Sequence, residues 1–441
     1  MPRRLLTTLL VSLFFSPLAA MAQDAPPPPL IGERDGLWGA PQLMYRARGE
    51  LRDGADLDAD AEDSRLFGLQ RVRLGLALNY ADWLEALAVV QDARFAGMGN
   101  SSVAYTGNTD LHQGFARIHF GDTGLSLKLG RQQLVYGAQR LIGHLEWSNQ
   151  GRVFDAAKLS FKHPLGQLDG FTAVFAPQPG GNLFDATHFS GLYDTISLFD
   201  GMLVWDQYLL GLVDIGDALP PGQVASPELE VTAPARQLLT LGTRLAFEGY
   251  GARAELEGAY QLGDSDANEH IGHSAFALHA DARYTIPVPL DPYIGVEANY
   301  ATGDDAGTDT QAERFVNLFP TNHLHYGYMD LASWSNVING GLRAGFALGE
   351  LSFRLDYWLL ARASADDGWY NAGGQTLLAV ADAPDNDELL LGHEVDGSLM
   401  WKASENVKLV SGLGVFLPAG FALEKGGDPQ LWGFGMLIVS L

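Results

Sequence analysis

Arginine and lysine recur at every second position in several stretches of the first third of the sequence. Arg46 and Arg48 form one such pair, and Arg71 and Arg73 form another. The basic residues on this face of the first six predicted strands are Arg46, Arg48, Arg52, Arg65, Arg71, Arg73, Arg117, Lys128, Arg152, Lys158 and Lys162, against the acids Glu50 and Glu85. A guanidinium group keeps its charge and binds a carboxylate through two parallel hydrogen bonds. These residues predict a basic wall along which carboxylate-bearing anions could pass.

Later in the chain the same alternate spacing mixes both signs of charge. Arg343 and Arg354 lie on the inward face of the later predicted strands, and that face also holds acids, Glu297 and Asp356 among them. Opposite charges on adjacent strands are an ordinary way to fill the inside of a barrel. A second interpretation therefore stays open, in which the arginines are paired scaffold and line no path.

Groups that could catalyse a reaction are incomplete in this sequence. Ser148 and His144 lie close together, and His270 and His273 are three residues apart. Neither pair has a carboxylate partner or the spacing of metal ligands. The chain has no cysteine, which excludes a disulfide scaffold and a thiolate metal site. We expect no enzyme activity, no cofactor and no metal centre.

Acidic residues gather in the predicted loops. Lys and Arg number 28 against 53 Asp and Glu, giving a formal net charge of −25, which argues against a nucleic-acid partner. The segment 56–62 resembles a calcium loop in composition but lacks the glycine and the terminal bidentate glutamate of an EF-hand at their required spacing. A solvated surface bridged by cations explains it better, so surface Ca²⁺ at the acidic loops stays an alternative.

The amino terminus has the three parts of a secretory signal. Arg3 and Arg4 precede an apolar run over 5–18, and Ala20-Met21-Ala22 follows as a cleavage site. We expect residues 1–22 to be removed, with cleavage after about Ala22. The mature chain would then begin outside the cytoplasm.

The rest of the sequence alternates between apolar and polar residues. Within 351–362, Leu355 and Tyr357 share one face, while Arg354 and Asp356 share the other. A helix would mix these two sets, whereas a strand separates them. A period of two predicts β-strands.

About 18 such strands follow one another, and short joints alternate with long ones. The predicted strands cover 41–52, 65–80, 83–96, 111–120, 125–133, 152–162, 168–177, 188–199, 201–213, 236–248, 251–262, 273–287, 291–302, 333–348, 350–363, 391–402, 405–418 and 430–441. Short periplasmic turns and long extracellular loops are typical of outer-membrane barrels, and a soluble sandwich has no reason to sort its loops this way. We predict an all-β transmembrane antiparallel barrel over 41–441, after a periplasmic lead-in over 23–40. Sixteen strands stay an alternative.

One stretch carries many distinctive residues close together. It contains Gly130-Arg131-Gln132-Gln133, Tyr136-Gly137, Gln139-Arg140, Gly143, Trp147-Ser148-Asn149, Gly151-Arg152 and Phe154-Asp155-Ala156. This pattern resembles that of the alginate-export family of outer-membrane barrels. The resemblance implies a monomeric 18-stranded channel that passes an anionic polyuronate through an arginine-lined constriction. Its motif loop would contain Tyr136, Gly137, Arg140, Trp147, Asn149 and Asp155.

Arg131 needs separate treatment. It shares the parity of Leu127 and Leu129, so a regular strand would point it at lipid. Either the strand ends or bulges there and turns Arg131 inward, or Arg131 stays outside and meets lipopolysaccharide phosphate at the outer rim. The resemblance favours the inward orientation. The loop over 134–151 is long enough to fold into the mouth of the barrel or to pack on its neighbours, and both alternatives stay open. The predicted path residues are Arg46, Arg48, Arg71, Arg73, Arg131, Arg152, Arg343 and Arg354.

These observations predict a channel in the outer membrane of a Gram-negative-type bacterium. It would pass an acidic polysaccharide or smaller anions. The expected partners are membrane lipid, lipopolysaccharide and, for export, periplasmic proteins, and the barrel is expected to be a monomer. The first alternative is a general or substrate-specific porin for nutrient uptake, and the last is an outer-membrane hydrolase.

Overall fold

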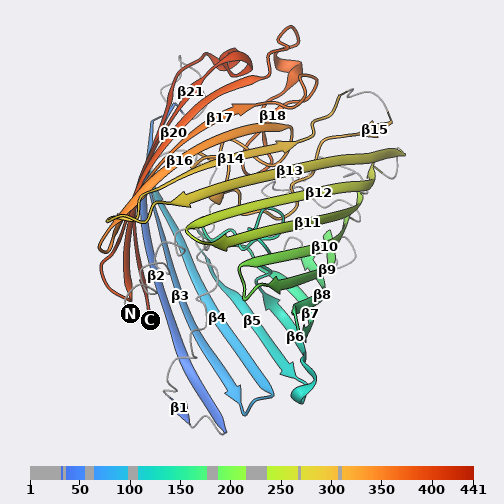
Figure 1. The fold of residues 1–441 in the computed structure, drawn as a ribbon, viewed down its shortest axis with the longest axis vertical. Coiled ribbons are helices and arrows are strands. Elements are labelled where there is room, and N and C mark those ends of the chain that lie inside the picture. The colour runs from blue at the N-terminus through green and yellow to red at the C-terminus, as the bar shows by residue number, and fades with distance from the viewer. Residues whose placement is uncertain are drawn as a thin grey trace.

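The computed structural model describes residues 31–32, 36–54, 64–97, 108–175, 187–214, 236–266, 270–305 and 310–441. The predicted signal peptide and the acidic segment 56–62 lie outside these residues. Within them, 18 antiparallel strands form one closed barrel, as the alternation and the connection lengths predicted (Figure 1).

The barrel strands are β2 (Leu37–Asp53), β3 (Arg65–Tyr80), β4 (Leu84–Gly97), β5 (Asn108–His119), β6 (Leu125–Gln132), β7 (Phe154–His163), β8 (Gly166–Phe175), β9 (Thr187–Leu198), β10 (Leu203–Asp214), β11 (Gln237–Gly249), β12 (Ala252–Asp266), β13 (Ile271–Thr285), β14 (Tyr293–Ala301), β16 (Val337–Leu348), β17 (Leu351–Ala361), β20 (Leu390–Lys402), β21 (Val407–Pro418) and β22 (Gln430–Ser440). Shorter elements are β1 (Ile31–Gly32), β15 (Gln311–Ala312), β18 (Trp369–Tyr370), β19 (Thr376–Leu378) and the 3₁₀ turns η1 (Gly121–Thr123), η3 (Asn322–Leu324), η4 (Val380–Asp382) and η5 (Gly420–Lys425).

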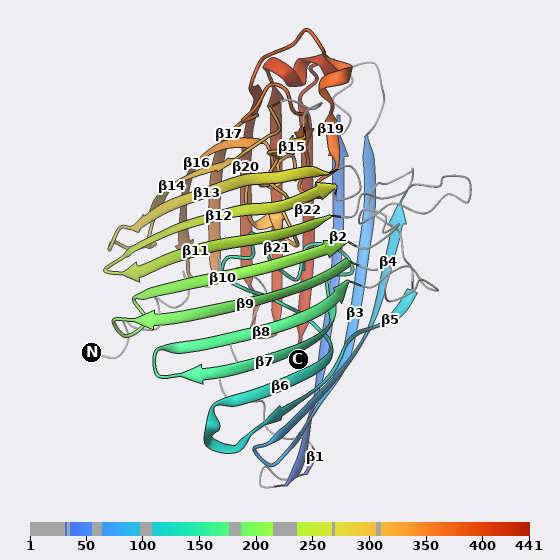
Figure 2. The same cartoon turned by 90° about the vertical axis from the view of Figure 1, so that its right-hand side faces the viewer.

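The first and last barrel strands close the ring. β2 pairs with β3 along one edge and with β22 along the other, both antiparallel, and Figure 2 shows β2 beside β22. β2 begins at Leu37, and β1 pairs with its first residues. The barrel therefore begins four residues before the predicted boundary at 41, because Leu37 to Ala40 extend the ladder with β3.

The alternation predicted from the sequence has apolar side chains outside and polar ones inside. On β17, the outward Leu355 is 58% exposed, whereas the inward neighbour Asp356 is 1% exposed. This is the reverse of a soluble sheet and suits a barrel whose outer face meets hydrocarbon. Among the described residues, no helix is long and apolar enough to cross a membrane.

Short and long connections sort to opposite ends of the barrel. Tight joints include Tyr250–Gly251 between β11 and β12, where both residues have positive φ (55° and 79°), as a two-residue hairpin requires. We name this end the turn rim. The opposite end, named the loop rim, carries the long connections, including residues 133–153, 302–336 and 362–389.

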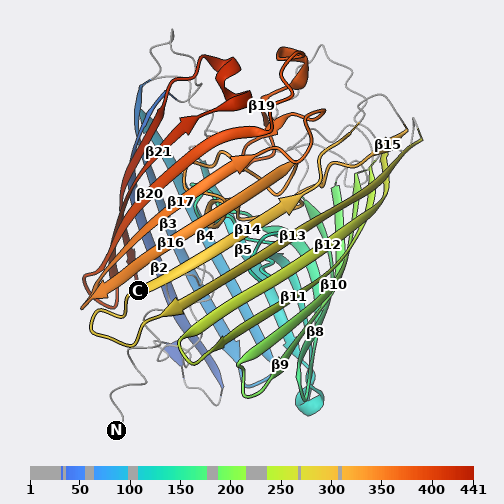
Figure 3. The same cartoon turned by 45° about the horizontal axis from the view of Figure 1, so that its top comes forward.

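Two of the long connections turn back into the barrel. The first inner loop (residues 133–153) and the second inner loop (residues 310–336) both contribute buried side chains to one apolar core, and Figure 3 shows loop segments inside the ring of strands. Phe319 lies against Phe154 of β7 and Phe189 of β9, with ring centroids 5.2 and 4.8 Å apart. Of the two alternatives for loop 134–151, the structure shows folding into the lumen.

Candidate functional site

The first inner loop is bound at one end to the basic wall. The Glu146 carboxylate pairs with Arg71 (2.5 Å) and Arg73 (2.7 Å) and accepts a hydrogen bond from Gln133 (2.9 Å). Arg46 donates to the main-chain oxygens of Glu146 (2.5 Å) and Ser148 (2.9 Å). All three arginines are buried. They hold the loop through charge and through its backbone.

Charge compensation fixes the ionisation of Glu146. Burial alone would raise the pKa of this carboxyl, because a low dielectric disfavours the charged form. The guanidinium groups of Arg71 and Arg73 outweigh that effect and hold the pKa of Glu146 far below its usual range. The carboxylate is therefore ionised at every physiological pH.

Trp147 and Asn149, shortly after Glu146 in the sequence, strengthen the attachment of the loop to the basic wall. The Trp147 ring lies between His323 of the second inner loop (centroids 3.7 Å apart, 10° between planes) and the Arg48 guanidinium (3.7 Å from the ring centroid). Asn149 accepts from Arg46 (3.3 Å), and its amide donates to the main-chain oxygens of β3 and β4. The motif residues Trp147 and Asn149 therefore serve the attachment of the loop.

The opposite end of the first inner loop is bound to an acidic wall. The Arg140 guanidinium lies 3.6 Å from Glu255, 3.7 Å from Glu257 and 3.8 Å from Glu297. It also donates to Nε2 of His279 at 2.6 Å. The loop thus bridges the lumen, with its acid on the basic side and its base on the acidic side.

Tyr136 and Gly137 lie just before Arg140. The Tyr136 hydroxyl donates to Asp169 (2.9 Å), and its ring stacks on Tyr193 with centroids 4.5 Å apart. Gly137 has φ of 52°, and a Cβ there would come within 2.8 Å of the Tyr193 hydroxyl. Glycine is required because the backbone passes so close to the wall.

One group in this acidic wall could offer three metal ligands. Glu255, His279 and Asp281 each present a ligand atom, all within 4.8 Å of one another. However, Glu255 pairs with Arg244 (2.5 Å), and Nε2 of His279 accepts from Arg140. Guanidinium groups already supply the positive charge, so the arrangement works as an ion network.

The two inner loops are joined to each other by backbone hydrogen bonds. The N–H of Gly143 donates to Phe319 O (2.8 Å), that of Phe319 to Leu141 O (2.8 Å) and that of Thr321 to Gln139 O (2.9 Å). We name this joined pair of loops the septum. It spans the lumen from the basic wall to the acidic wall.

Arg152 lies where the two loops meet. Its side chain donates to Pro320 O (2.8 Å) and Gly143 O (3.2 Å). Among the described residues, Arg152 makes no ion pair with a carboxylate within 4.0 Å. Burial lowers the pKa of Arg152 to about 10, which leaves it charged at neutral pH. In the described part of the chain, no neighbouring acid pairs with this cation.

The second inner loop is held by β17 and β20. Arg354 donates to the Tyr328 hydroxyl (3.2 Å) and pairs with Asp356 (2.5 Å). The main-chain N–H groups of Tyr328 and Met329 donate to Asp396 (3.1 Å) and Glu394 (2.9 Å). Arg343 of β16 pairs with Asp356 (2.9 Å) and Glu297 (3.3 Å).

Two cavities lie on opposite sides of the septum. The loop-side vestibule has a volume of about 1000 Å³, and the turn-side cavity has about 330 Å³. Among the described residues, the charged lining of the vestibule is basic in seven positions and acidic in three: Arg48, Arg52, Arg65, Arg152, Arg236, Arg314 and Lys425 against Glu50, Asp53 and Asp330. The turn-side cavity is nearly balanced, with Arg140, Arg244, Arg253, Arg283 and Arg343 against Glu248, Glu255, Asp281 and Glu297.

The predicted path residues divide into three groups, and the third is Arg131 alone, which is described in the next paragraph. Arg48, Arg152 and Arg343 line one of these cavities. Arg46, Arg71, Arg73 and Arg354 line neither and hold the septum instead. Sequence reasoning missed Arg236, Arg314 and Lys425, because Arg314 and Lys425 lie outside the predicted strands and Arg236 lies at the very start of one. Their positive charge in otherwise acidic loops was the available signal.

The predicted orientation of Arg131 needs correction. It pairs with Asp155 across β6 and β7 (2.9 Å), and both share the outward parity of Leu129, which is 46% exposed. The strand stays regular enough at this point to keep Arg131 outside, so the predicted inward orientation is wrong. Asp155 likewise belongs to β7 and not to the loop.

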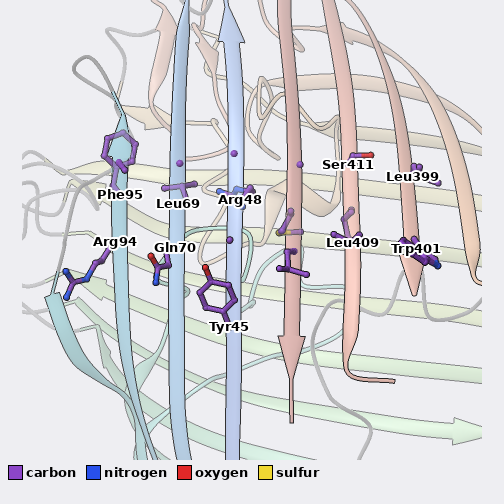
Figure 4. A pocket seen from close by; sticks show the side chains of 18 of the residues that line it. Tyr45, Arg48, Leu69, Gln70, Arg94, Phe95, Leu399, Trp401, Leu409 and Ser411 are labelled. Atoms are coloured by element: carbon purple, nitrogen blue, oxygen red, sulfur yellow. The ribbon is translucent and has the colours of Figure 1, made fainter. Parts of the chain in front are cut away.

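A third cavity lies on the outward face at the closing seam. This groove of about 920 Å³ crosses β4, β3, β2, β22, β21 and β20 (Figure 4). Small outward residues such as Ala47 and Gly435 form its floor, with Tyr45 and Trp401 among its larger lining residues. The septum and the two inner cavities lie on the other side of the wall.

The residues considered for catalysis do not form a catalytic pair. The Ser148 hydroxyl accepts from the N–H of Gln150 (3.4 Å), and both ring nitrogens of His144 are buried with no hydrogen-bond partner in the described ranges. Nothing in this geometry activates a nucleophile.

Comparison with known protein families identifies the family of this chain. A family model described as "Alginate export" matches residues 38–430. The chain belongs to the alginate export family. Both the family and the fold are of channel type and not of enzyme type.

Solved structures similar to this chain are outer-membrane porins of Pseudomonas aeruginosa. The outer membrane protein OprD is 13% identical with a TM-score of 0.57, covering 91% of this chain and 93% of that one. OccK2 (OpdF) in complex with glucuronate is 12% identical (TM-score 0.57; 91% and 98% covered), and OpdK with vanillate is 9% identical (TM-score 0.58; 91% and 98%). No curated protein sequence matches. At these identities the likeness shows the fold alone, and with the family it supports an outer-membrane channel.

Proposed function

We propose that this barrel is an anion-selective outer-membrane channel for acidic saccharides, which enter through the basic vestibule. The observation that carries the proposal is the lining of that vestibule, with seven basic positions against three acidic ones among the described residues. The whole chain has a net charge of −25, so this local excess runs against the overall composition.

The local charges outweigh the distant ones. Charges inside a narrow passage with low-dielectric walls act over a few Å, whereas exposed charges are largely screened beyond roughly 8 Å at physiological salt. Loop acids at the rim therefore influence an anion in the vestibule less than the arginines that line it. Guanidinium groups also suit carboxylates geometrically.

Arg152 is the residue proposed to meet the carboxylate. Among the described residues, the hydrogen bonds of its guanidinium go to two neutral carbonyl groups, those of Gly143 and Pro320, and both are donated by one nitrogen. Arg314, by contrast, already pairs with Asp367 (3.2 Å), and Arg52 pairs with Glu50 (3.3 Å). A uronate that reaches the vestibule would therefore gain the most electrostatic binding energy at Arg152, because no carboxylate among the described residues already pairs with that guanidinium.

The surroundings of the barrel are part of the same proposal. We assign the loop rim to the extracellular side, since long loops face outward in this class of barrel. The outward groove at the β2–β22 seam would be filled by membrane lipid, with lipopolysaccharide at the level of Arg131. The functional unit would be a monomer in the outer membrane of a Gram-negative-type bacterium, with periplasmic partners if transport is outward.

Reversal potentials in planar lipid bilayers test the function. The wild-type pore is expected to prefer anions, and Arg152→Gln is expected to reduce that preference. Arg131→Gln is the matched control, because it removes the same charge from the outward face of the same region. A wild-type pore that prefers cations would overturn the proposal, as would equal selectivity of Arg152→Gln and wild type.

A further inference from the structure

Two lysines face each other at the turn rim. Lys402 is the last residue of β20, Lys408 is the second residue of β21, and the two are directly opposed in the ladder between these strands. Lys402 shares the parity of the buried Asp396. Lys408 shares the parity of the buried Phe416, so both lysines point into the barrel. Each keeps part of its surface exposed, so water in the lumen reaches both side chains.

Like charges at directly opposed strand positions destabilise a sheet. Where other basic residues oppose each other in this barrel, an acid lies beside the pair. Lys158, which opposes Lys128, pairs with Asp169 (3.0 Å). The other opposed pairs with a neighbouring acid are Arg46 and Arg71 with Glu146, Arg52 and Arg65 with Glu50, Arg117 and Lys128 with Glu85, and Arg253 and Arg283 with Glu248. By contrast, among the described residues neither Lys402 nor Lys408 pairs with a carboxylate within 4.0 Å.

Acids on the adjacent turns do not compensate the two lysines. The N–H of Lys402 donates to Glu350 O (3.0 Å), and Glu405 lies in the turn between β20 and β21. Both glutamates belong to the described ranges and are exposed, and neither carboxylate lies within 4.0 Å of the lysine ammonium groups. Exposed charges act on each other through water, where the attraction between opposite charges is weak. The positive charge of the pair therefore faces the lumen.

The ladder row of the two lysines leads to the basic wall. Lys408 opposes Ile438 of β22, and Ile438 in turn opposes Arg46 of β2. Neighbouring strands lie about 4.8 Å apart, so Lys408 and Arg46 are roughly 10 Å apart along the wall. The hydrogen bonds of Arg46 to the first inner loop go to main-chain and amide oxygens, which are uncharged. The row therefore adds a further cation above the lysine pair and places the pair on the turn side of the septum.

We infer that Lys402 and Lys408 form a second anion site, on the turn side of the septum, that binds a carboxylate of an acidic saccharide between their two ammonium groups. The inference rests on the proposed anion channel and adds a binding site for the same class of substrate. Each ammonium group has three donors on a flexible stem, so both can reach the oxygens of one carboxylate. The bound anion replaces the repulsion between the lysines with attraction to a shared partner. An acidic saccharide then meets a cation on each side of the septum, Arg152 in the vestibule and the lysine pair at the turn rim.

Block of the ionic current by a short oligouronate in planar lipid bilayers tests the site. The chain has no cysteine, so Asp122→Cys in the exposed turn η1, present in every protein tested, lets a bulky thiol reagent identify the chamber that the turn rim faces. Oligouronate in that chamber is expected to block the current. The double variant Lys402→Gln with Lys408→Gln is expected to need about fivefold more oligouronate for half block, because one exposed ion pair contributes up to about fivefold in affinity. An unchanged half-block concentration would overturn the inference.

Lys162→Gln is the matched control for the single variant Lys408→Gln. Lys162 lies at the turn end of β7, shares the inward parity of the buried Ser160 and opposes Gln167. Its removal takes one positive charge from the same end of the lumen without breaking an opposed basic pair. Block from the turn rim is expected to weaken in Lys408→Gln and to stay unchanged in Lys162→Gln. Equal weakening would assign the effect to the overall charge of the rim and would overturn the site.

Thermal denaturation in detergent separates a binding role from a structural one. Replacing both lysines removes a repulsion between like charges, so the midpoint of the double variant is expected to be no lower than that of the wild type. A lower midpoint would show that the two lysines stabilise the barrel, and the binding role would be wrong.

Oligouronate added on the loop side separates this inference from the proposed function. Block from that side is expected to be the same in the wild type and in the double lysine variant, and Arg152→Gln is expected to weaken it. If loop-side block depends on Arg152 but turn-side block does not depend on the lysines, the second site alone is wrong. If oligouronate blocks from neither side and the pore prefers cations, the proposed anion channel itself is wrong.

Discussion

Neutralising Glu146 should release the first inner loop from the basic wall. Glu146→Gln keeps the size of the side chain but leaves Arg71 and Arg73 buried without their shared counterion. Removing one partner of a buried ion pair costs about 3–5 kcal/mol. Arg73 keeps its bond to Gln91 (2.7 Å) and Arg71 keeps Ser148 O (3.3 Å), so the lower end applies. About 3 kcal/mol corresponds to a roughly hundredfold shift toward the released loop.

Thiol labelling can measure that shift. Ile142 is 2% exposed at the contact between the loops, so Ile142→Cys in this cysteine-free chain reports when the contact opens. Adding Glu146→Gln is expected to raise the labelling rate by up to about a hundredfold. Glu405→Gln, on an exposed turn, is the matched control and should change nothing. Equal labelling rates with and without Glu146→Gln would refute the idea that the Glu146 ion pairs hold the loop against the basic wall, and would leave that role to the other contacts of the loop.

Three further predictions follow from the same network. Arg140→Gln should lower the free energy of unfolding by about 3–5 kcal/mol, since Glu257 makes no other ion pair among the described residues; thermal denaturation in detergent measures it, and an unchanged midpoint contradicts it. The contribution of Glu146 should be complete above its ordinary pKa of about 4.3 and lost only as pH falls toward its depressed folded value. The labelling rate of Ile142→Cys, divided at each pH by that of a fully exposed cysteine to correct for the thiolate fraction, should therefore be equal at pH 7 and pH 5; a higher ratio at pH 5 contradicts it. Asp155→Asn should leave ion selectivity unchanged, because the Arg131 pair faces outward; a shifted reversal potential would place the pair in the lumen.

Strand parity made most of the barrel predictable. Alternation is a local property of an extended chain, so each strand can be read from a few neighbouring residues. Loop lengths added the sorting of the connections between the two rims. The start of the barrel was missed because Pro41 and the small residues Gly39 and Ala40 give no clear alternation, although they pair regularly with β3.

The function of the inward arginines was harder to predict for a physical reason. The alternation along the strand predicts that Arg71 and Arg73 point into the lumen, but it does not predict which loops also enter the lumen. Their partner Glu146 lies more than seventy residues away in an aperiodic loop, and only folding brings it near. These residues fit the second interpretation of the sequence, in which the inward arginines pair with acids and line no path. The difference is that their acid comes from a loop and not from an adjacent strand.

The distribution of charge on the first inner loop explains why it enters the lumen in one orientation. Glu146 lies toward one end and Arg140 toward the other, and the walls that they meet carry the opposite charges. Reversing the loop would place Glu146 among Glu255, Glu257 and Glu297, and Arg140 among buried arginines. Like charges in a buried site are strongly unfavourable, so the wrong orientation is penalised as much as the right one is favoured. The arginines of the first strands, which outnumber the acids on the same face, therefore orient the septum. The anion preference proposed for the channel depends instead on the cations that remain exposed in the vestibule above the septum.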